Sequence, residues 1–250
     1  MQVSVEQIWE SFWNFGSGSC PEPVSTVPNS DKAVPKADVL GLDIWPGALA
    51  LCNYLAVHRG LVHGRRAIEL GAGMGLPGLL AGQLGARECL LTDYEPLVLD
   101  LLKENVKVNS LEGPCAVHAL DWAEPGSTMD SRDLHTFNVV LAADVLYISD
   151  IVLPFVAVLQ ALLHPEGIAL IGHQTRRPLA LDPETGVPTL SERDQPFESF
   201  LESLKAAGLV HRVLGSLDAG GSAGPLFLLA IAWDETLVAA LEPVPPLETP

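Results

Sequence analysis

The chain has 250 residues, of which 48% are hydrophobic, so it is long and apolar enough to form one large domain with a sizeable core. Its formal net charge is −17, and its 14 Lys and Arg residues are scattered. This balance disfavours a nucleic-acid partner, because phosphate backbones repel an acidic protein, and no apolar run reaches the roughly 18 residues of a membrane helix.

The cysteines and the first residues bear on the compartment. The start, Met1–Glu6, lacks the basic and apolar regions of a signal peptide. The four cysteines lie far apart and form no C-x-x-C pair, which indicates free thiols in a reducing compartment (Cys20, Cys52, Cys89 and Cys115). We therefore expect a cytoplasmic protein, also able to act in the nucleus, that is monomeric, binds no metal and does not associate with membranes.

Residues 1–37 are expected to form a short helix and a flexible linker. Ser4-Val5-Glu6-Gln7 has the spacing of a capping box, and large apolar residues of this segment fall on one helical face (Val5, Ile8, Trp9, Phe12 and Trp13). This helix could pack on the domain, or it could cover a ligand or recognise a partner. Residues 14–37 are rich in Gly, Ser and Pro, which is typical of a linker.

Helices and strands alternate through residues 38–235, which we predict to be the main domain. A helix begins at Trp45-Pro46 and continues to Val57. The remaining predicted helices are 76–84, 96–109, 150–163 and 194–207, and the predicted strands are 66–70, 88–92, 115–120, 137–143, 168–172, 209–214 and 225–233. Residues 173–192 are predicted to be one long loop, and 236–250 a Pro-rich, disordered tail.

These elements predict an α/β fold. The uninterrupted apolar run Phe137–Ala143 is typical of a parallel strand that is buried on both faces. The last two strands are joined by a Gly-rich turn, which indicates an antiparallel hairpin. We predict a Rossmann-like, doubly wound, mostly parallel sheet of seven strands, with an antiparallel C-terminal hairpin and helices on both faces.

The segment Arg66–Gly78 is the most informative part of the chain. It reads as a buried strand, a Gly-rich turn and the start of a helix, with Pro77 in the first helical turn. Gly71 and Gly73 would let a ligand lie directly on main-chain N–H groups. Nucleotide phosphates and S-adenosylmethionine both use such a turn, and a tight turn without any ligand is the third possibility.

Glu69 favours one of these two ligands over the other. A carboxylate two positions before the first glycine would repel a pyrophosphate, but it would attract the ammonium and sulfonium groups of S-adenosylmethionine. Residues 73–78 also match the dinucleotide pattern G-x-G-x-x-G, although a single match of this kind is weak. We therefore expect S-adenosylmethionine, with Glu69, Gly71 and Gly73 as binding residues.

Polar residues at the ends of the next two strands extend the predicted site. Asp93 lies 18 residues after Gly75, near the distance at which an acidic residue meets ribose hydroxyls in such folds. Asp121 could accept from an adenine amino group, and Trp122 could stack on the ring. Each aspartate could instead only cap the helix that follows.

Five blocks in this order resemble the seven-β-strand methyltransferases of lysine methyltransferase family 16, whose members modify chaperones and elongation factors. The blocks are Trp45-Pro46, residues 69–75, Thr92-Asp93, Asp121-Trp122 and residues 143–147, and the resemblance covers roughly residues 40 to 233. It implies binding of S-adenosylmethionine by Trp45, Gly71, Gly73, Asp93, Trp122 and Ala143. It also implies that Asp144 and Tyr147 form a D-x-x-Y motif beside the acceptor nitrogen.

The resemblance implies in-line transfer of a methyl group to a lysine side chain of a protein, such as a chaperone or translation factor. Asp144 would align the amine and Tyr147 would line the channel, although Asp144 could instead cap a helix. Three alternatives remain open. The acceptor could be a small metabolite, the protein could be a non-catalytic module that binds a partner through its N-terminal helix, or it could be an NAD-dependent oxidoreductase.

Overall fold

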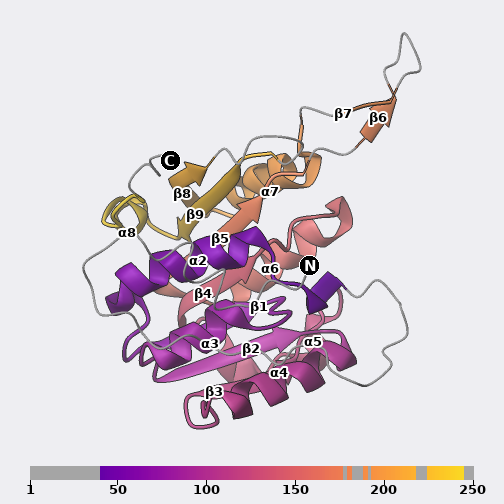
Figure 1. Cartoon of the computed structure of the whole chain (residues 1–250). Coiled ribbons are helices and arrows are strands. Elements are labelled where there is room, and N and C mark those ends of the chain that lie inside the picture. Colours follow the sequence, from indigo (N-terminus) through magenta and orange to yellow (C-terminus); the bar gives the residue numbers. More distant parts are fainter. Residues whose placement is uncertain (1–39, 177–178, 182–187, 191–192, 218–223, 245–250) are drawn as a thin grey trace, which may run out of the picture.

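The computed structural model describes residues 40–176, 179–181, 188–190, 193–217 and 224–244. The predicted N-terminal helix and linker therefore lie outside the described residues. Seven strands form one sheet in the order β3-β2-β1-β4-β5-β9-β8 (Figure 1). They are β1 (Arg66–Leu70), β2 (Glu88–Asp93), β3 (Cys115–Ala119), β4 (Phe137–Ala143), β5 (Leu163–Gln174), β8 (Val210–Leu217) and β9 (Leu226–Ala232).

The topology confirms the predicted doubly wound fold. Strands β1 to β5 pair in parallel, whereas β9 is antiparallel to both β5 and β8. The C-terminal hairpin folds back so that β9 lies between β5 and β8. Strand order reverses at β1, which lies between β2 and β4, and such a switch point is where ligands bind in open α/β sheets.

Helices cover both faces of the sheet (Figure 1). One apolar core lies under α2 (Pro46–Val57), α3 (Leu76–Gln83), α4 (Pro96–Val108) and α8 (Glu235–Ala239). The other lies under α6 (Val152–Leu162) and α7 (Gln195–Ala206), and a short helix, α5 (Pro125–Thr128), follows β3. Single-turn 3₁₀ helices occur at Leu40–Leu42, Arg59–Leu61, Ser131–Asp133 and Ser149–Ile151.

Three predictions of local structure were wrong. Strand β5 begins at Leu163 rather than 168, because Leu163 pairs with Phe137 across a register shift that takes up the His164–Gly167 segment. The expected loop 173–192 contains a small hairpin of β6 (Leu179–Leu181) and β7 (Pro188–Leu190), which lies apart from the main sheet (Figure 1).

The third correction concerns the C-terminal tail. Residues 236–244 were expected to be disordered, but they continue the domain. Val238 of α8 is buried, the Val244 N–H donates to the Leu214 carbonyl, and the Tyr54 hydroxyl donates to the Glu242 carbonyl. The apolar side chains Val238 and Val244 thus join the core despite the prolines nearby, and residues 245–250 lie outside the described part.

Candidate active site

A cavity of about 530 Å³ lies at the carboxyl ends of β1, β2, β3 and β4. Nine of the ten predicted site residues line it: Trp45, Gly71, Gly73, Asp93, Asp121, Trp122, Ala143, Asp144 and Tyr147. They come from five separate parts of the sequence. The sheet assembles them because parallel strands of a doubly wound fold all end at the same edge.

The Gly-rich turn forms one wall of this cavity with bare backbone. Gly71 and Gly73 have φ of 64° and 53°, a left-handed conformation that side chains disfavour. A Cβ on Gly71 would lie 2.9 Å from Val145 Cγ1 and 3.1 Å from the Trp122 ring. Both the left-handed conformation and the lack of space for a Cβ therefore require glycine at Gly71. Without side chains, the main-chain atoms of the turn face the cavity.

Glu69 is the predicted site residue that does not line the cavity. Its side chain is only 1% exposed, and Oε2 accepts a hydrogen bond of 2.8 Å from the Gly78 N–H in the first turn of α3. Burial raises the pKa of Glu69 to about 8. The expected direct attraction to the cofactor's positive groups is thus not what the structure shows, since strand alternation turns this carboxyl toward α3.

Asp93 is the last residue of β2, and its side chain holds the Gly-rich turn that follows β1. Its Oδ2 accepts from the Gly73 N–H at 3.1 Å, while Oδ1 accepts from the N–H groups of Tyr94 and Glu95 at 2.8 and 3.1 Å. Burial raises its pKa, although these hydrogen bonds favour the ionised form. Asp93 thus bridges the glycine turn and the start of α4, and its remaining acceptor positions are available to ligand hydroxyls.

Trp122 and Asp121 form the far wall, after β3. Trp122 packs on Phe155, with ring centroids 5.0 Å apart, and its six-membered ring lies against Gly71. Asp121 accepts from the Ala123 N–H at 2.9 Å. This pairing of a flat aromatic face with a carboxylate is suited to a purine ring that carries an amino group.

Asp144 links the end of β4 to the start of α2 and the end of β5 through hydrogen bonds. Its Oδ2 accepts from the Gly47 N–H at 2.6 Å and its Oδ1 from the Gln174 N–H at 2.7 Å, while its own N–H donates to the Gly172 carbonyl at 2.8 Å. Its φ is 53°, an uncommon conformation that aspartate tolerates. Burial raises the pKa of Asp144. The end of β4 thereby fixes the start of α2 and the end of β5.

Two functional features were missed by sequence reasoning. Gly47 must be glycine, because a Cβ there would lie 2.5 Å from Asp144 Oδ2 and 2.6 Å from the Gly172 carbonyl oxygen. Arg176 also lines the cavity, and its guanidinium carbon lies 4.8 Å from the Trp45 ring centroid and 5.9 Å from that of Tyr147. Arg176 falls in residues 173–192, which were predicted to be one long loop, so no motif or periodicity marked it.

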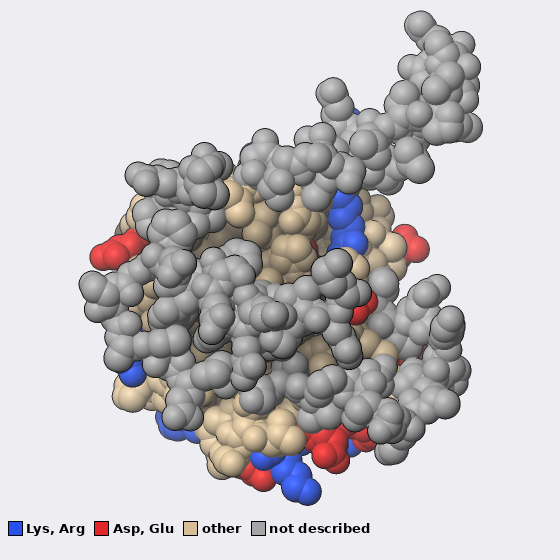
Figure 2. Space-filling model, viewed as in Figure 1, with Lys and Arg blue, Asp and Glu red and all other residues tan. Residues whose placement is uncertain are grey.

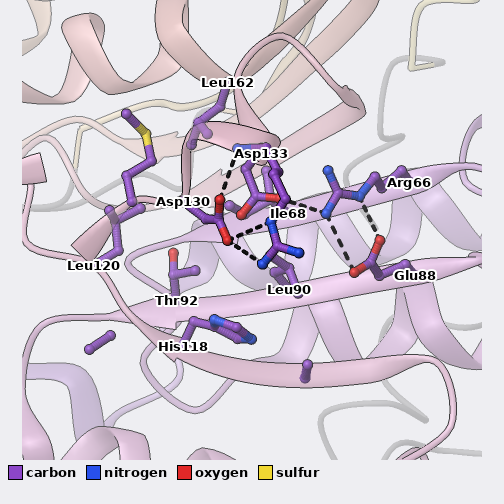
Figure 3. A pocket seen from close by; sticks show the side chains of 14 residues that line it. Arg66, Ile68, Glu88, Leu90, Thr92, His118, Leu120, Asp130, Asp133 and Leu162 are labelled. Carbon is purple, nitrogen blue, oxygen red and sulfur yellow. Dashed lines mark hydrogen bonds and ion pairs between the residues drawn. The ribbon is translucent and has the colours of Figure 1, made fainter. Parts of the chain in front are cut away.

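A second cavity, of about 640 Å³, lies on the sheet face formed by β1, β2 and β3 (Figure 3). None of the predicted site residues lines it. Its arginines form ion pairs within the cavity wall: Arg66 with Glu88 and Asp133 at 2.5 and 2.7 Å, and Arg132 with Asp130 at 2.6 Å. These five charged side chains thus pair with one another within the cavity wall.

A sequence model of a protein family described as lysine methyltransferase matches residues 35–197, which is more than half of the chain. The chain belongs to this lysine methyltransferase family. The matched range contains all ten predicted site residues and every wall of the first cavity. Family membership and the cavity's position confirm the resemblance on which the site was predicted.

Relatives of this chain carry names for two kinds of acceptor residue. The chain is 36% identical over 108 residues to the histone-arginine methyltransferase METTL23 of Xenopus laevis, covering 43% of this chain and 45% of that protein. It is 36% identical over 124 residues to the protein N-lysine methyltransferase METTL21A of Danio rerio, covering 48% and 53%. The chain spans about half the length of the curated relatives it matches.

Solved structures support the same fold. The chain aligns with precorrin-6y C5,15-methyltransferase of Geobacter metallireducens at a TM-score of 0.52 and 15% identity, over 84% of this chain and 97% of that one. An S-adenosylmethionine-dependent methyltransferase of Mesorhizobium loti aligns at 0.50 and 17% identity, over 75% and 96%. At these identities the likeness concerns the fold.

No helix in the described ranges is long and apolar enough to cross a membrane. No three His, Cys, Asp or Glu side chains of the described residues are grouped to hold a metal ion. On the face shown in Figure 2, the described Lys and Arg side chains are interspersed with Asp and Glu rather than gathered into one basic patch.

Proposed function

We propose that this chain is an S-adenosylmethionine-dependent methyltransferase that methylates a lysine side chain of a protein. The observation that carries the proposal is the assembly of nine predicted site residues around one cavity at the switch point of the sheet. Membership of the lysine methyltransferase family supports it.

The residues present suit this cofactor along the whole cavity. Trp122 and Asp121 would bind the adenine, Asp93 the ribose hydroxyls, and the bare backbone at Gly71 and Gly73 the methionine portion. S-adenosylmethionine, when bound, supplies a methyl group activated by its sulfonium. Asp144 and Tyr147, at the end of β4, would face the acceptor.

Asp144 is better suited to positioning an amine than to deprotonating it. Two backbone N–H groups already hold its carboxylate, which fixes the direction of its remaining acceptor positions. A carboxylate near an ammonium raises the pKa of that amine, which opposes deprotonation. We infer that Asp144 and Tyr147 align the acceptor nitrogen with the methyl carbon, and that positioning supplies much of the rate.

The acceptor is proposed to be a lysine of a protein, with translation factors and chaperones as candidates; arginine is the second candidate. Arginine is considered because a matching relative is named a histone-arginine methyltransferase. The acidic chain favours a basic protein segment as partner in either case. We further propose that it acts as a monomer in the cytoplasm, with the nucleus as a further location; the four widely spaced cysteines favour a reducing compartment.

Transfer of labelled methyl from S-adenosylmethionine into a protein extract tests the proposal. A labelled protein band that appears with the native enzyme and is lost with Asp93→Ala and with Asp144→Ala is the expected result. Mass spectrometry of the band would then identify methyllysine, or methylarginine if the second candidate is right. Cofactor binding without any labelled protein would indicate a small-molecule acceptor, and absence of cofactor binding would refute the proposal.

A further inference from the structure

The charges around the first cavity are strongly unbalanced. Six carboxyl side chains line it, and Arg176 is the single Lys or Arg among the described lining residues. The carboxyl residues are Asp43, Asp93, Glu95, Asp121, Asp144 and Asp150. An isolated guanidinium in such surroundings would be expected to form an ion pair with one of them.

Arg176 forms no ion pair with any carboxylate of the described residues. Its Nε is buried and has no hydrogen-bond partner there. The guanidinium instead lies over the faces of Trp45 and Tyr147. A buried donor of a charged group that lacks a hydrogen-bond partner lowers the stability of the fold. This arrangement therefore indicates that the guanidinium binds a further acceptor, such as a ligand.

The backbone holds Arg176 in this position. The Arg176 N–H donates to Asp194 Oδ2 at 2.8 Å, and the same oxygen lies 3.0 Å from Nε2 of the buried His173. Asp194 Oδ1 accepts from the Phe197 N–H and so caps α7. These hydrogen bonds fix the main chain that carries the guanidinium of Arg176. The guanidinium of Arg132, at the second cavity, is instead paired with Asp130.

We propose that Arg176 binds the carboxylate of the methionine portion of S-adenosylmethionine. This inference rests on the proposed function and deepens it. Adenine is assigned to Trp122 and ribose to Asp93, so the methionine portion must extend toward Trp45, Asp144 and Tyr147, where Arg176 lies.

The chemistry of the cofactor supports this assignment. Its ammonium and sulfonium groups are positive and suit a cavity lined by carboxylates, whereas its carboxylate is the group that those side chains would repel. A guanidinium presents a planar fork of donors that matches a carboxylate in bidentate geometry. Arg176 thus supplies the one counter-charge that the described lining offers to that group.

Decarboxylated S-adenosylmethionine is the probe that isolates this contact, because it differs from the cofactor only in lacking the carboxylate. We expect calorimetry to show that the native protein binds the complete cofactor roughly 10- to 100-fold more tightly than the decarboxylated one. Arg176→Gln should lose that preference by weakening only the complete cofactor. Arg176→Lys should keep part of it, because the charge remains while the bidentate geometry is lost.

Arg132→Gln is the matched control, since it removes an exposed arginine at the second cavity. It should bind both compounds as the native protein does, and circular dichroism should confirm that every variant is folded. Equal weakening of both compounds by Arg176→Gln would overturn the inference. So would unchanged cofactor affinity with an altered KM for the protein acceptor, which would assign Arg176 to the acceptor. If the native protein bound neither compound, the proposed function itself would fail.

Discussion

Replacing Glu69 with Gln should remove a pH dependence from the stability of this fold. The carboxyl is completely buried, and burial raises its pKa from 4.5 to about 8. Between these two values the folded protein holds a proton that the unfolded chain has released. Stability must therefore fall as pH rises through this range, and it must level off above about 8, where both states are ionised.

The size of the effect follows from the linkage relation. One proton released on unfolding changes the free energy of unfolding by about 1.4 kcal/mol per pH unit, so the native protein should lose about 3 kcal/mol over two units within this range. The Gln variant cannot ionise, and its side-chain oxygen can still accept from the Gly78 N–H. As the pH rises by two units within this range, the free energy of unfolding of the variant should therefore increase by about 3 kcal/mol relative to that of the native protein.

Urea unfolding of both proteins at several pH values from about 5.5 to 7.5 measures this difference directly. Glu88→Gln is the control: the ion pair with Arg66 lowers the pKa of Glu88, so that residue is ionised in both states across the same range. Its stability difference from the native protein should not change with pH. Parallel curves for native protein and Glu69→Gln would refute the reasoning, because they would mean that Glu69 is ionised in the folded state.

Three further substitutions test the site. Gly47→Ala should destabilise the fold by about 1–3 kcal/mol in urea unfolding, because the new Cβ would meet Asp144 Oδ2 and a backbone carbonyl, whereas Gly60→Ala has open space and should change little. Asp93→Asn should weaken cofactor binding in calorimetry by roughly tenfold or more, with Asp100→Asn, an exposed position on α4, as the neutral control. Asp144→Asn should lower the rate of methyl transfer in single-turnover assays more than it lowers cofactor affinity in calorimetry, since its amide cannot accept from both backbone N–H groups that the carboxylate holds.

The positions of the site residues could be predicted because they lie at strand ends. Asp93 is the last residue of β2, Asp144 directly follows β4, and Asp121 lies two positions after β3; parallel strands bring such ends to one edge. The direction in which each side chain points, and the groups that it contacts, could not be predicted from the sequence. Asp144 bonds to the N–H of Gly47, 97 residues away, and a contact at that separation has no local signature.

The elements that were mispredicted share a physical cause. Proline and glycine in His164–Gly167 signal a turn, but pairing of Leu163 with Phe137 extends the strand through them. Residues 236–244 adjoin a Pro-rich C-terminus, with Pro243, Pro245 and Pro246, yet Val238 is buried in the core and Val244 packs against it. In each case tertiary packing outweighs local preference.

Glu69 shows how a correct choice of ligand can rest on an incorrect placement. Its charge was the reason to prefer S-adenosylmethionine over a dinucleotide, yet the carboxyl faces α3 and a Cβ on Gly78 would lie 2.6 Å from its Oε2. The preference survives because other groups provide the same discrimination. Among the described residues, six carboxyl side chains and one arginine line the cavity, so a ligand with two phosphates would meet net repulsion, whereas a ligand with two positive groups and one carboxylate matches both signs.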